Sequence, residues 1–252
     1  MNNPTYQGRT FIGWTGSNGN TPNVAVTIPI GSTGNKSYIA NWNVQTYTVK
    51  FDNNGGIGTM DDQIFQYDEF QKLSKNTFMN QVVVQFDGNG GTPETNRLVS
   101  FKEFLGWATS PDGGVEYSDE ANVKNLTSDS EITLYAKWGA PNKIYLPTAD
   151  RAGYSLLGWY TEGGESKGTS GDEYQPTVDI TLYAHWSTRS YTATFYHNDG
   201  TSNYTQKTQG YGTALSAPSI AREGYQLTGW NPQVPSTMPA GDSSYTAQWS
   251  IS

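Results

Sequence analysis

The chain has 252 residues, a net charge of −8 and a pI of about 4.7, with 15 lysines and arginines against 23 aspartates and glutamates. An acidic surface repels phosphate backbones and anionic lipid, so nucleic acid and membrane surfaces are not expected as partners. Cysteine is absent and only two histidines are present, which excludes disulfides and thiolate metal sites and argues against four-ligand zinc.

Two short phrases recur along the chain and contain all eight tryptophans. One phrase ends in Gly-Trp, the other ends in Ala-x-Trp, and the two alternate strictly. The Gly-Trp phrases end at Trp14, Trp107, Trp159 and Trp230, and the Ala-x-Trp phrases end at Trp42, Trp138, Trp186 and Trp249. The alternation indicates four related units, for which we expect the boundaries 1–44, 45–138, 139–187 and 188–252. Such small units bury little surface alone, so neighbours are expected to stabilise one another.

The first unit is expected to be a truncated repeat, because MNNPTYQGRTFIGW enters a repeat already in progress. This opening has neither a basic start nor an apolar stretch, so it does not resemble a signal peptide. We therefore expect the chain to be a fragment of a longer protein. No apolar run along the chain approaches the length of a membrane span.

Residues 47–56, 82–91 and 191–200 contain a third phrase, an alternating apolar run that stops at Asn, Asp and Gly. These residues tolerate positive φ and favour tight turns, so each phrase predicts a strand that runs into a hairpin. The unit 45–138 contains two of these phrases, whereas the unit 139–187 contains none. Neighbouring units are therefore expected to share strands.

One helix is predicted, over residues 68–78, where Phe70, Leu73 and Phe78 recur near helical spacing and Asp68 would act as the cap. The rest of the chain, rich in Gly, Pro and aromatic residues, predicts many short strands joined by turns. The predicted fold class is therefore β-rich, with an α+β class left open by this helix.

The Ala-x-Trp phrase predicts the strand that closes each unit. With a period of two, Leu134, Ala136 and Trp138 share one face, and Lys137 lies on the other. The same sorting places large apolar side chains of the closing and hairpin strands in a small core. The predicted core residues are Trp42, Trp138, Trp186, Trp249, Phe51, Phe86 and Phe195.

No catalytic site, metal site or cofactor is predicted. His185 is expected to point outward from a closing strand and His197 to lie in a turn, and neither has a Ser or Cys partner at a recognisable spacing. Acidic pairs such as Asp172 and Glu173 are adjacent in sequence, which does not supply the separation that a glycosidase requires.

The runs DNNGG and DGNGG place the oxygens of Asp52, Asn54, Asp87 and Asn89 on alternating positions, as in some calcium loops. Both runs lack the length and the distal bidentate glutamate of an EF-hand loop. Hairpin turns are therefore favoured over ion sites at these positions.

Carbohydrate-binding proteins stack aromatic rings on sugars, and 13% of this chain is aromatic. The periodicity does not decide where the Gly-Trp tryptophans point, because the adjacent Leu156 and Leu157 fall on both faces of their strand. Gly158 is expected to mark a bulge or a close backbone approach. The candidate ligand surface consists of Trp14, Trp107, Trp159, Tyr160 and Trp230.

Several phrases resemble the Listeria and Bacteroides type surface repeats, the family that includes the B repeat of internalin B. The resemblance rests on YTVKFDNNGG, REGYQLTGW, STMPAGDSSYTAQW and DRAGYSLLGWYTEGG followed by ITLYAHW, and it covers nearly the whole chain. It implies an extracellular, cell-surface or cell-wall location in a bacterium, usually Gram-positive. It also implies β-grasp (ubiquitin-like) modules in an elongated array.

The leading hypothesis is a non-enzymatic, monomeric stalk or adhesin segment. Such a segment would attach to a host or bacterial surface protein or glycan through repeated weak contacts that add by high effective concentration. Two alternatives stay open, an array of carbohydrate-binding modules and an accessory region of an extracellular hydrolase.

Overall fold

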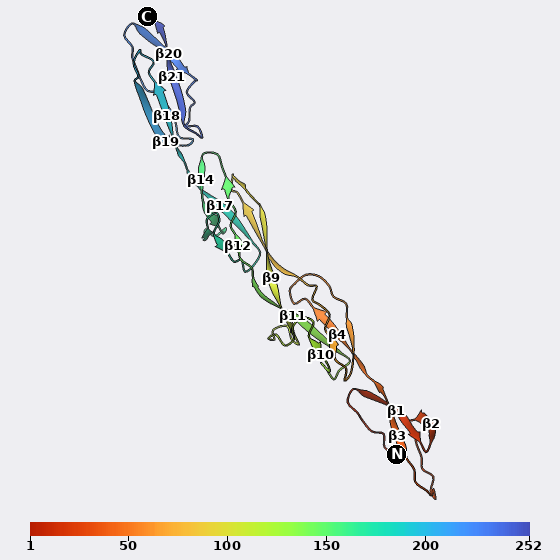
Figure 1. Cartoon of the computed structure of the whole chain (residues 1–252). Helices are drawn as coiled ribbons and strands as arrows, with labels where there is room; N and C mark the ends of the chain where they lie inside the picture. Colours follow the sequence, from red (N-terminus) through yellow and green to blue (C-terminus); the bar gives the residue numbers. More distant parts are fainter. The chain divides into compact units, whose positions relative to one another are not determined.

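The computed structural model describes all 252 residues. Its regular secondary structure consists of β-strands alone, with no helix (Figure 1). The chain forms two compact units. Unit 1 comprises residues 1–81 and 101–141, and unit 2 comprises residues 82–100 and 142–252. The chain therefore crosses from one unit to the other three times.

Unit 1 contains mostly antiparallel strands, and its strands have the bounds β1 (Arg9–Gly16), β2 (Gly19–Asn23), β3 (Tyr38–Val44), β4 (Thr46–Asp52), β5 (Gln63–Gln66), β6 (Gln71–Lys72), β10 (Asn122–Val123) and β11 (Glu131–Pro141). Two further strands, β7 (Asn80–Asp87) and β9 (Arg97–Ala108), have residues in both units. β1 lies between β2 and β3, and β4 pairs with β5 on one side and with β11 on the other.

Unit 2 contains the remaining strands, β8 (Thr92–Pro93), β12 (Ile144–Tyr145), β13 (Ala149–Asp150), β14 (Tyr154–Tyr160), β15 (Ser166–Gly168), β16 (Glu173–Tyr174), β17 (Ile180–Thr188), β18 (Ser190–Tyr196), β19 (Tyr204–Gly210), β20 (Tyr225–Asn231) and β21 (Ser243–Ile251). The last four form one sheet in the order β19-β18-β21-β20, drawn in blue in Figure 1. β14 lies between β15 and β17.

Three repeats share one arrangement, in which the first and last strands pair in parallel. Repeat A pairs β4 with β11, repeat B pairs β7 with β17, and repeat C pairs β18 with β21. In each repeat the Gly-Trp strand (β9, β14 or β20) then pairs with the last strand in the antiparallel direction. Parallel neighbours require a crossover connection, and here the crossover contains no helix.

The first strand of repeat B comes from the hairpin phrase at 82–91. In β7 the partners of Val84 and Phe86 are Ile180 and Leu182 of β17. The Val83 amide also donates to the Asp179 carboxylate at 2.7 Å. The segment 139–187, which has no hairpin phrase of its own, thus receives its first strand from a part of the chain that precedes β9.

Each repeat has its own hydrophobic core, one in unit 1 and two in unit 2. The predicted alternation along the closing strand of repeat A is confirmed for Leu134 and Ala136, which have no exposed surface, while Tyr135 and Lys137 are half-buried. Trp138 is half-buried, and the register of the strand shifts between it and Lys137. The same pattern recurs in β17 and β21. The strands of the hairpin phrases also form as predicted, but residues 53–62 and 197–203 make longer loops than a tight turn.

The predicted helix over 68–78 is wrong. Asp68 has a φ of 66° and lies in a turn, after which the chain stays extended through β6. Leu73 and Phe78 are almost fully buried, whereas Phe70 is 63% exposed, so the three side chains do not share a face. The apparent helical spacing came from two core residues of an extended segment and one surface residue.

Gly158 was predicted to mark a bulge or a close backbone approach, and both are present. The register of β14 against β17 shifts between Leu156 and Gly158, and a Cβ at Gly158 would lie 2.6 Å from the Gly168 carbonyl oxygen. The bulge re-aims the side chains that follow it. As a result Trp159 has no exposed surface, although Leu157, two residues earlier, is 50% exposed.

Candidate functional site

The turn after the first strand of repeat A is tied to the closing strand by two hydrogen bonds. The Asn54 side-chain amide donates to the Ala136 carbonyl at 3.0 Å, and the Trp138 indole N–H donates to the Asn53 carbonyl at 2.9 Å. We call this pair of bonds the latch. It joins the hairpin phrase directly to the Ala-x-Trp phrase, so each phrase depends on the other.

The latch recurs in repeats B and C with the same donors and acceptors. The pairs are Asn89 with Ala184 (3.2 Å), Trp186 with Gly88 (2.9 Å), Asn198 with Ala247 (3.0 Å) and Trp249 with His197 (2.9 Å). The three asparagines have φ values of 46°, 45° and 52°, a region that Asn tolerates better than most residues. This explains why all three hairpin phrases carry Asn at this point.

DNNGG and DGNGG form turns as predicted, although the first lies in a longer loop than a tight hairpin turn. The carboxylates of Asp52 and Asp87 accept the backbone N–H of Asn54 and Asn89, at 2.7 and 2.8 Å. These bonds are typical of Asx-turns, in which the side chain takes over a backbone bond. Asp52 and Asp87 therefore have a turn-forming role.

Replacing Asn89 by alanine is expected to lower the free energy of unfolding by about 1–2 kcal/mol. The change removes the partly buried hydrogen bond from the Asn89 side chain to the Ala184 carbonyl, and it places alanine at a positive φ. Urea denaturation would measure the loss. Asn96→Ala is the matched control, because Asn96 is an exposed residue of the same unit and should change stability by less than about 0.5 kcal/mol. Equal effects of the two substitutions would contradict a stabilising latch.

Repeats B and C meet at Gly153, which has a φ of 83°. The Gly153 carbonyl accepts the Arg189 N–H at 2.9 Å, and the Arg189 carbonyl accepts the Tyr211 N–H at 2.8 Å. The Tyr211 ring lies so close to Gly153 that any Cβ there would overlap it. The same ring packs edge-on against Tyr154, with centroids 5.5 Å apart. We call this arrangement the joint.

A second joint in unit 1 links the three-stranded segment β1–β3 to repeat A. Gly8 has a φ of 73°, and its carbonyl accepts the Gln45 N–H at 2.9 Å. The Gln45 carbonyl accepts the Tyr67 N–H at 3.0 Å, and a Cβ on Gly8 would overlap the Tyr67 ring. Both joints thus use a glycine, a linker residue and a tyrosine that follows the second strand of the next repeat.

The Gly-Trp tryptophans of the candidate ligand surface are not equivalent. Trp107 and Trp159 have no exposed surface, and the Trp159 indole N–H donates to the Pro147 carbonyl at 2.7 Å. Trp14 and Trp230 are half-buried, and Trp230 packs edge-on against Phe195. Burial removes Trp107 and Trp159 from the candidate ligand surface, because a ring without exposed surface cannot stack on a sugar.

Tyr160, the last residue of that surface, stacks on His185 with centroids 4.0 Å apart and planes inclined by 10°. Both rings are half-buried, so each covers one face of the other. Of the predicted core residues, Phe86 and Phe195 are buried members of the cores, and the half-buried Phe51, Trp138 and Trp186 pack against them. Trp42 and Trp249 are half-buried and belong to none of the three cores.

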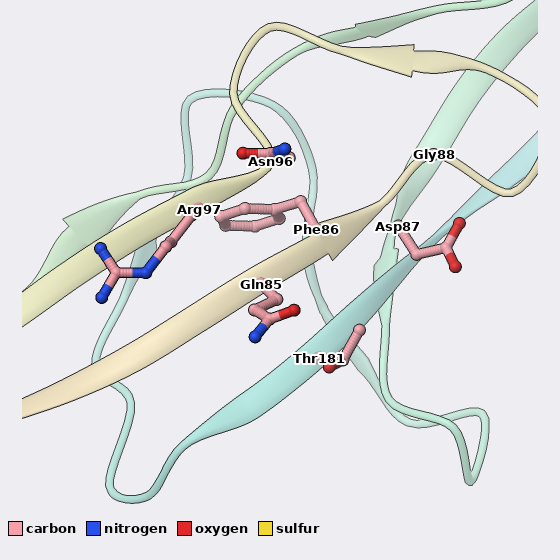
Figure 2. A pocket seen from close by; sticks show the side chains of 7 residues that line it. All are labelled: Gln85, Phe86, Asp87, Gly88, Asn96, Arg97 and Thr181. Atoms are coloured by element: carbon pink, nitrogen blue, oxygen red, sulfur yellow. The ribbon is translucent and has the colours of Figure 1, made fainter.

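A hollow in the surface, of about 470 Å³, lies in unit 2. Figure 2 shows Arg97 and Asp87 at opposite ends of it, with Gln85 and Thr181 along β7 and β17. Its only ring belongs to Phe86, which is 4% exposed. A neighbouring hollow of about 430 Å³ shares Gln85, Arg97 and Thr181. Together they form a polar trough without an aromatic platform.

A groove of about 440 Å³ in unit 1 has a different character, because Phe70 lies at its edge. The Lys124 ammonium lies 4.9 Å from the centre of this exposed ring. Hydrogen bonds from the Thr109 N–H and hydroxyl, at 2.9 and 2.7 Å, lower the pKa of Glu116, while burial raises the pKa of Tyr117. The groove therefore combines an exposed ring with fixed positive and negative charges.

Phe70 was not predicted to lie on the surface, because its spacing from Leu73 and Phe78 placed its ring on the face of a predicted helix. The signal that could have found it is its setting between charged and polar residues, in YDEFQK. The two histidines occupy structural positions, since His185 stacks on Tyr160 and the His197 ring hydrogen-bonds the Thr205 hydroxyl at 2.8 Å. No three His, Asp or Glu side chains gather as metal ligands would, and no helix is present that could cross a membrane.

The latch, the joint and the parallel pairing of end strands define a tandem array of small all-β repeats. The chain belongs to the Listeria-Bacteroides repeat domain family, whose sequence model matches residues 100–137, 140–185 and 191–250, more than half of the chain. This finding confirms the resemblance of the repeated phrases.

Three curated relatives are similar over parts of their length. A Gly-rich membrane protein of Evansella cellulosilytica is 30% identical over 50% of this chain and 19% of its own length. A membrane protein of the same organism is 23% identical over 79% of this chain and 30% of its own length. Internalin H of Listeria monocytogenes is 34% identical over 54% of this chain and 24% of its own length. The chain thus spans less than a third of each relative, and no solved structure matches it.

Proposed function

We propose that this chain is a force-transmitting stalk segment of a bacterial cell-surface protein, without enzymatic activity. The observation that carries the proposal is the parallel pairing of the first and last strands in repeats A, B and C. In a parallel pair, the start of one strand and the end of the other lie at opposite ends of the ladder. Tension along the chain would therefore shear the whole ladder at once.

The latches support this proposal because they add bonds across the loaded pair. In repeat C the Asn198 and Trp249 bonds join the end of β18 and its turn to β21. These side-chain bonds would have to break together with the backbone ladder. Similarity to internalin H supports a location at the cell surface of a Gram-positive bacterium. There the repeats would present other parts of the protein, or would themselves make weak adhesive contacts that add together.

The strand order of repeat C also supports a relationship to the β-grasp fold. Its order β19-β18-β21-β20, with a parallel central pair, is the order expected when a hairpin is followed by a crossover and a second antiparallel pair. We infer that the repeat is a β-grasp derivative whose crossover lacks the helix. An elongated array of such repeats would suit the stalk function.

Pulling experiments on single molecules test the stalk proposal. Because the chain has no cysteine, handles can be placed at will by serine-to-cysteine changes at exposed positions of repeat C. The pair Ser190 and Ser252 shears β18 against β21, whereas the pair Ser190 and Ser244 pulls them apart from one end. We expect a several-fold higher rupture force in the first geometry. Equal forces in the two geometries would refute the proposal.

Carbohydrate binding remains a second candidate function, and the exposed Phe70 in its groove is the observation that favours it. If Phe70 is a stacking platform, Phe70→Ala should weaken binding of a glycan by about tenfold or more in calorimetric titration. Ile64→Ala is the matched control, since Ile64 is 67% exposed and lies outside the groove. A glycan panel that shows no saturable heat, or an equal loss in both variants, would exclude Phe70 as a sugar site.

A further inference from the structure

Repeat C presents most of a joint at Gly224. Its φ of 74° matches those of Gly8 and Gly153, at 73° and 83°. The Gly224 carbonyl accepts the Ser252 N–H at 3.1 Å, in the way that Gly153 accepts Arg189. Ser252 therefore occupies the place of the linker residue.

The turn that carries Gly224 is built like the turn at Gly153. The Arg222 guanidinium lies 3.9 Å from the centre of the Tyr225 ring, and the corresponding distance from Arg151 to Tyr154 is 4.1 Å. In both turns the tyrosine N–H donates to the arginine carbonyl, at 3.1 and 3.0 Å. A cation over a ring and a backbone bond thus fix both turns in the same conformation.

The difference between the joints is the tyrosine ring. A Cβ on Gly8 or Gly153 would overlap the ring of Tyr67 or Tyr211, whereas a Cβ on Gly224 would have no heavy atom within 4 Å. The Tyr225 side chain is 38% exposed, while its counterpart Tyr154 packs against Tyr211. The turn conformation is kept although nothing occupies the space in front of the glycine.

We infer that Gly224, Tyr225 and Ser252 form an acceptor face for one further repeat of this same type. The occupant is the tyrosine that follows the second strand of that repeat, with its ring on Gly224 and its N–H donating to the Ser252 carbonyl. A second copy of this chain would not supply it, because Tyr67 and Tyr211 already fill the joints of their own units. The inference rests on the stalk function proposed above and names how the stalk is extended.

The test is a chain in which residues 190–252 are repeated after Ser252, so that Ser252 replaces Arg189 as the linker residue. We expect amide exchange at Ser252 and Tyr225 to slow by about tenfold or more on extension. Gly224→Ala should have a small effect on the thermal midpoint of the 252-residue chain and lower that of the extended chain by several degrees. Gly171→Ala is the matched control, because Gly171 has a φ of 84° and open space around it, and it should have the same small effect in both chains.

A second pair of variants separates the ring from its hydroxyl. In the added repeat, the tyrosine equivalent to Tyr211 is changed to phenylalanine, which should keep the slow exchange, or to alanine, which should abolish it. Equal effects of Gly224→Ala in both chains, unchanged exchange on extension, or failure of the added repeat to fold beside this face would each overturn the inference. These readouts measure stability and not rupture force, so the inference and the stalk function can fail separately.

Discussion

Replacing Trp159 by alanine is expected to lower the free energy of unfolding of unit 2 by about 3–5 kcal/mol. The side chain has no exposed surface and packs edge-on against Phe86, with ring centroids 4.9 Å apart. Its indole N–H donates to the Pro147 carbonyl, so the truncation also leaves a buried acceptor without its partner. The cavity would lie in the centre of the repeat B core.

Chemical denaturation followed by circular dichroism would measure this loss, with Leu157→Ala as the matched control. Leu157 lies two residues away on the same strand and is 50% exposed, so its truncation should cost less than about 1 kcal/mol. If the two truncations had equal effects, Trp159 would not be the centre of this core. A stability loss for Trp159→Ala without any change in glycan binding would agree with its burial.

Gly153→Ala is expected to destabilise the joint between repeats B and C by about 2–4 kcal/mol. Part of the cost is steric, because the new Cβ would overlap the Tyr211 ring, which itself packs on Tyr154. The other part is the positive φ of 83°, which alanine adopts at a cost. We expect the chain to respond by moving Tyr211 away, which would loosen the joint.

The measurement is calorimetric unfolding of Gly153→Ala beside the control Gly171→Ala. Gly171 has nearly the same φ, but no atom lies within 4 Å of the position of its Cβ, so the control carries the backbone cost alone. We expect Gly153→Ala to split the unfolding of unit 2 into two transitions, with repeat C separating from repeat B. A single transition shifted equally in both variants would show that Tyr211 does not couple the two repeats.

Strands and their inward faces could be predicted from local patterns. The run from Ile132 to Trp138 alternates with a period of two, and a strand with one buried face imposes this alternation wherever it pairs. The direction of Trp159 could not be predicted in this way, because the bulge at Gly158 changes the face midway along the strand. A glycine in a strand predicts that a bulge exists there, but not which side chain turns inward after it.

Which distant segments pair with each other also could not be predicted from the sequence. The bond from Val83 to Asp179 and the register of β7 against β17 join residues far apart in the chain, and no local pattern encodes that distance. The joint was also missed, since it depends on a glycine carbonyl, a linker and a tyrosine ring from three separate segments. Phe70 was misplaced because helical spacing alone does not distinguish a buried ring from an exposed one.

The three crossings of the chain between its two units change what a single break can do. After a cut that follows Pro141, residues 82–100 stay attached to the first fragment, yet β7 is still paired with β17 of the second fragment. The two products therefore remain associated through a parallel ladder and the latch from Trp186 to Gly88. In a simple string of modules, one proteolytic nick between neighbours releases everything beyond it. Here the interlaced connectivity provides redundancy, and a nicked molecule would keep its ends joined.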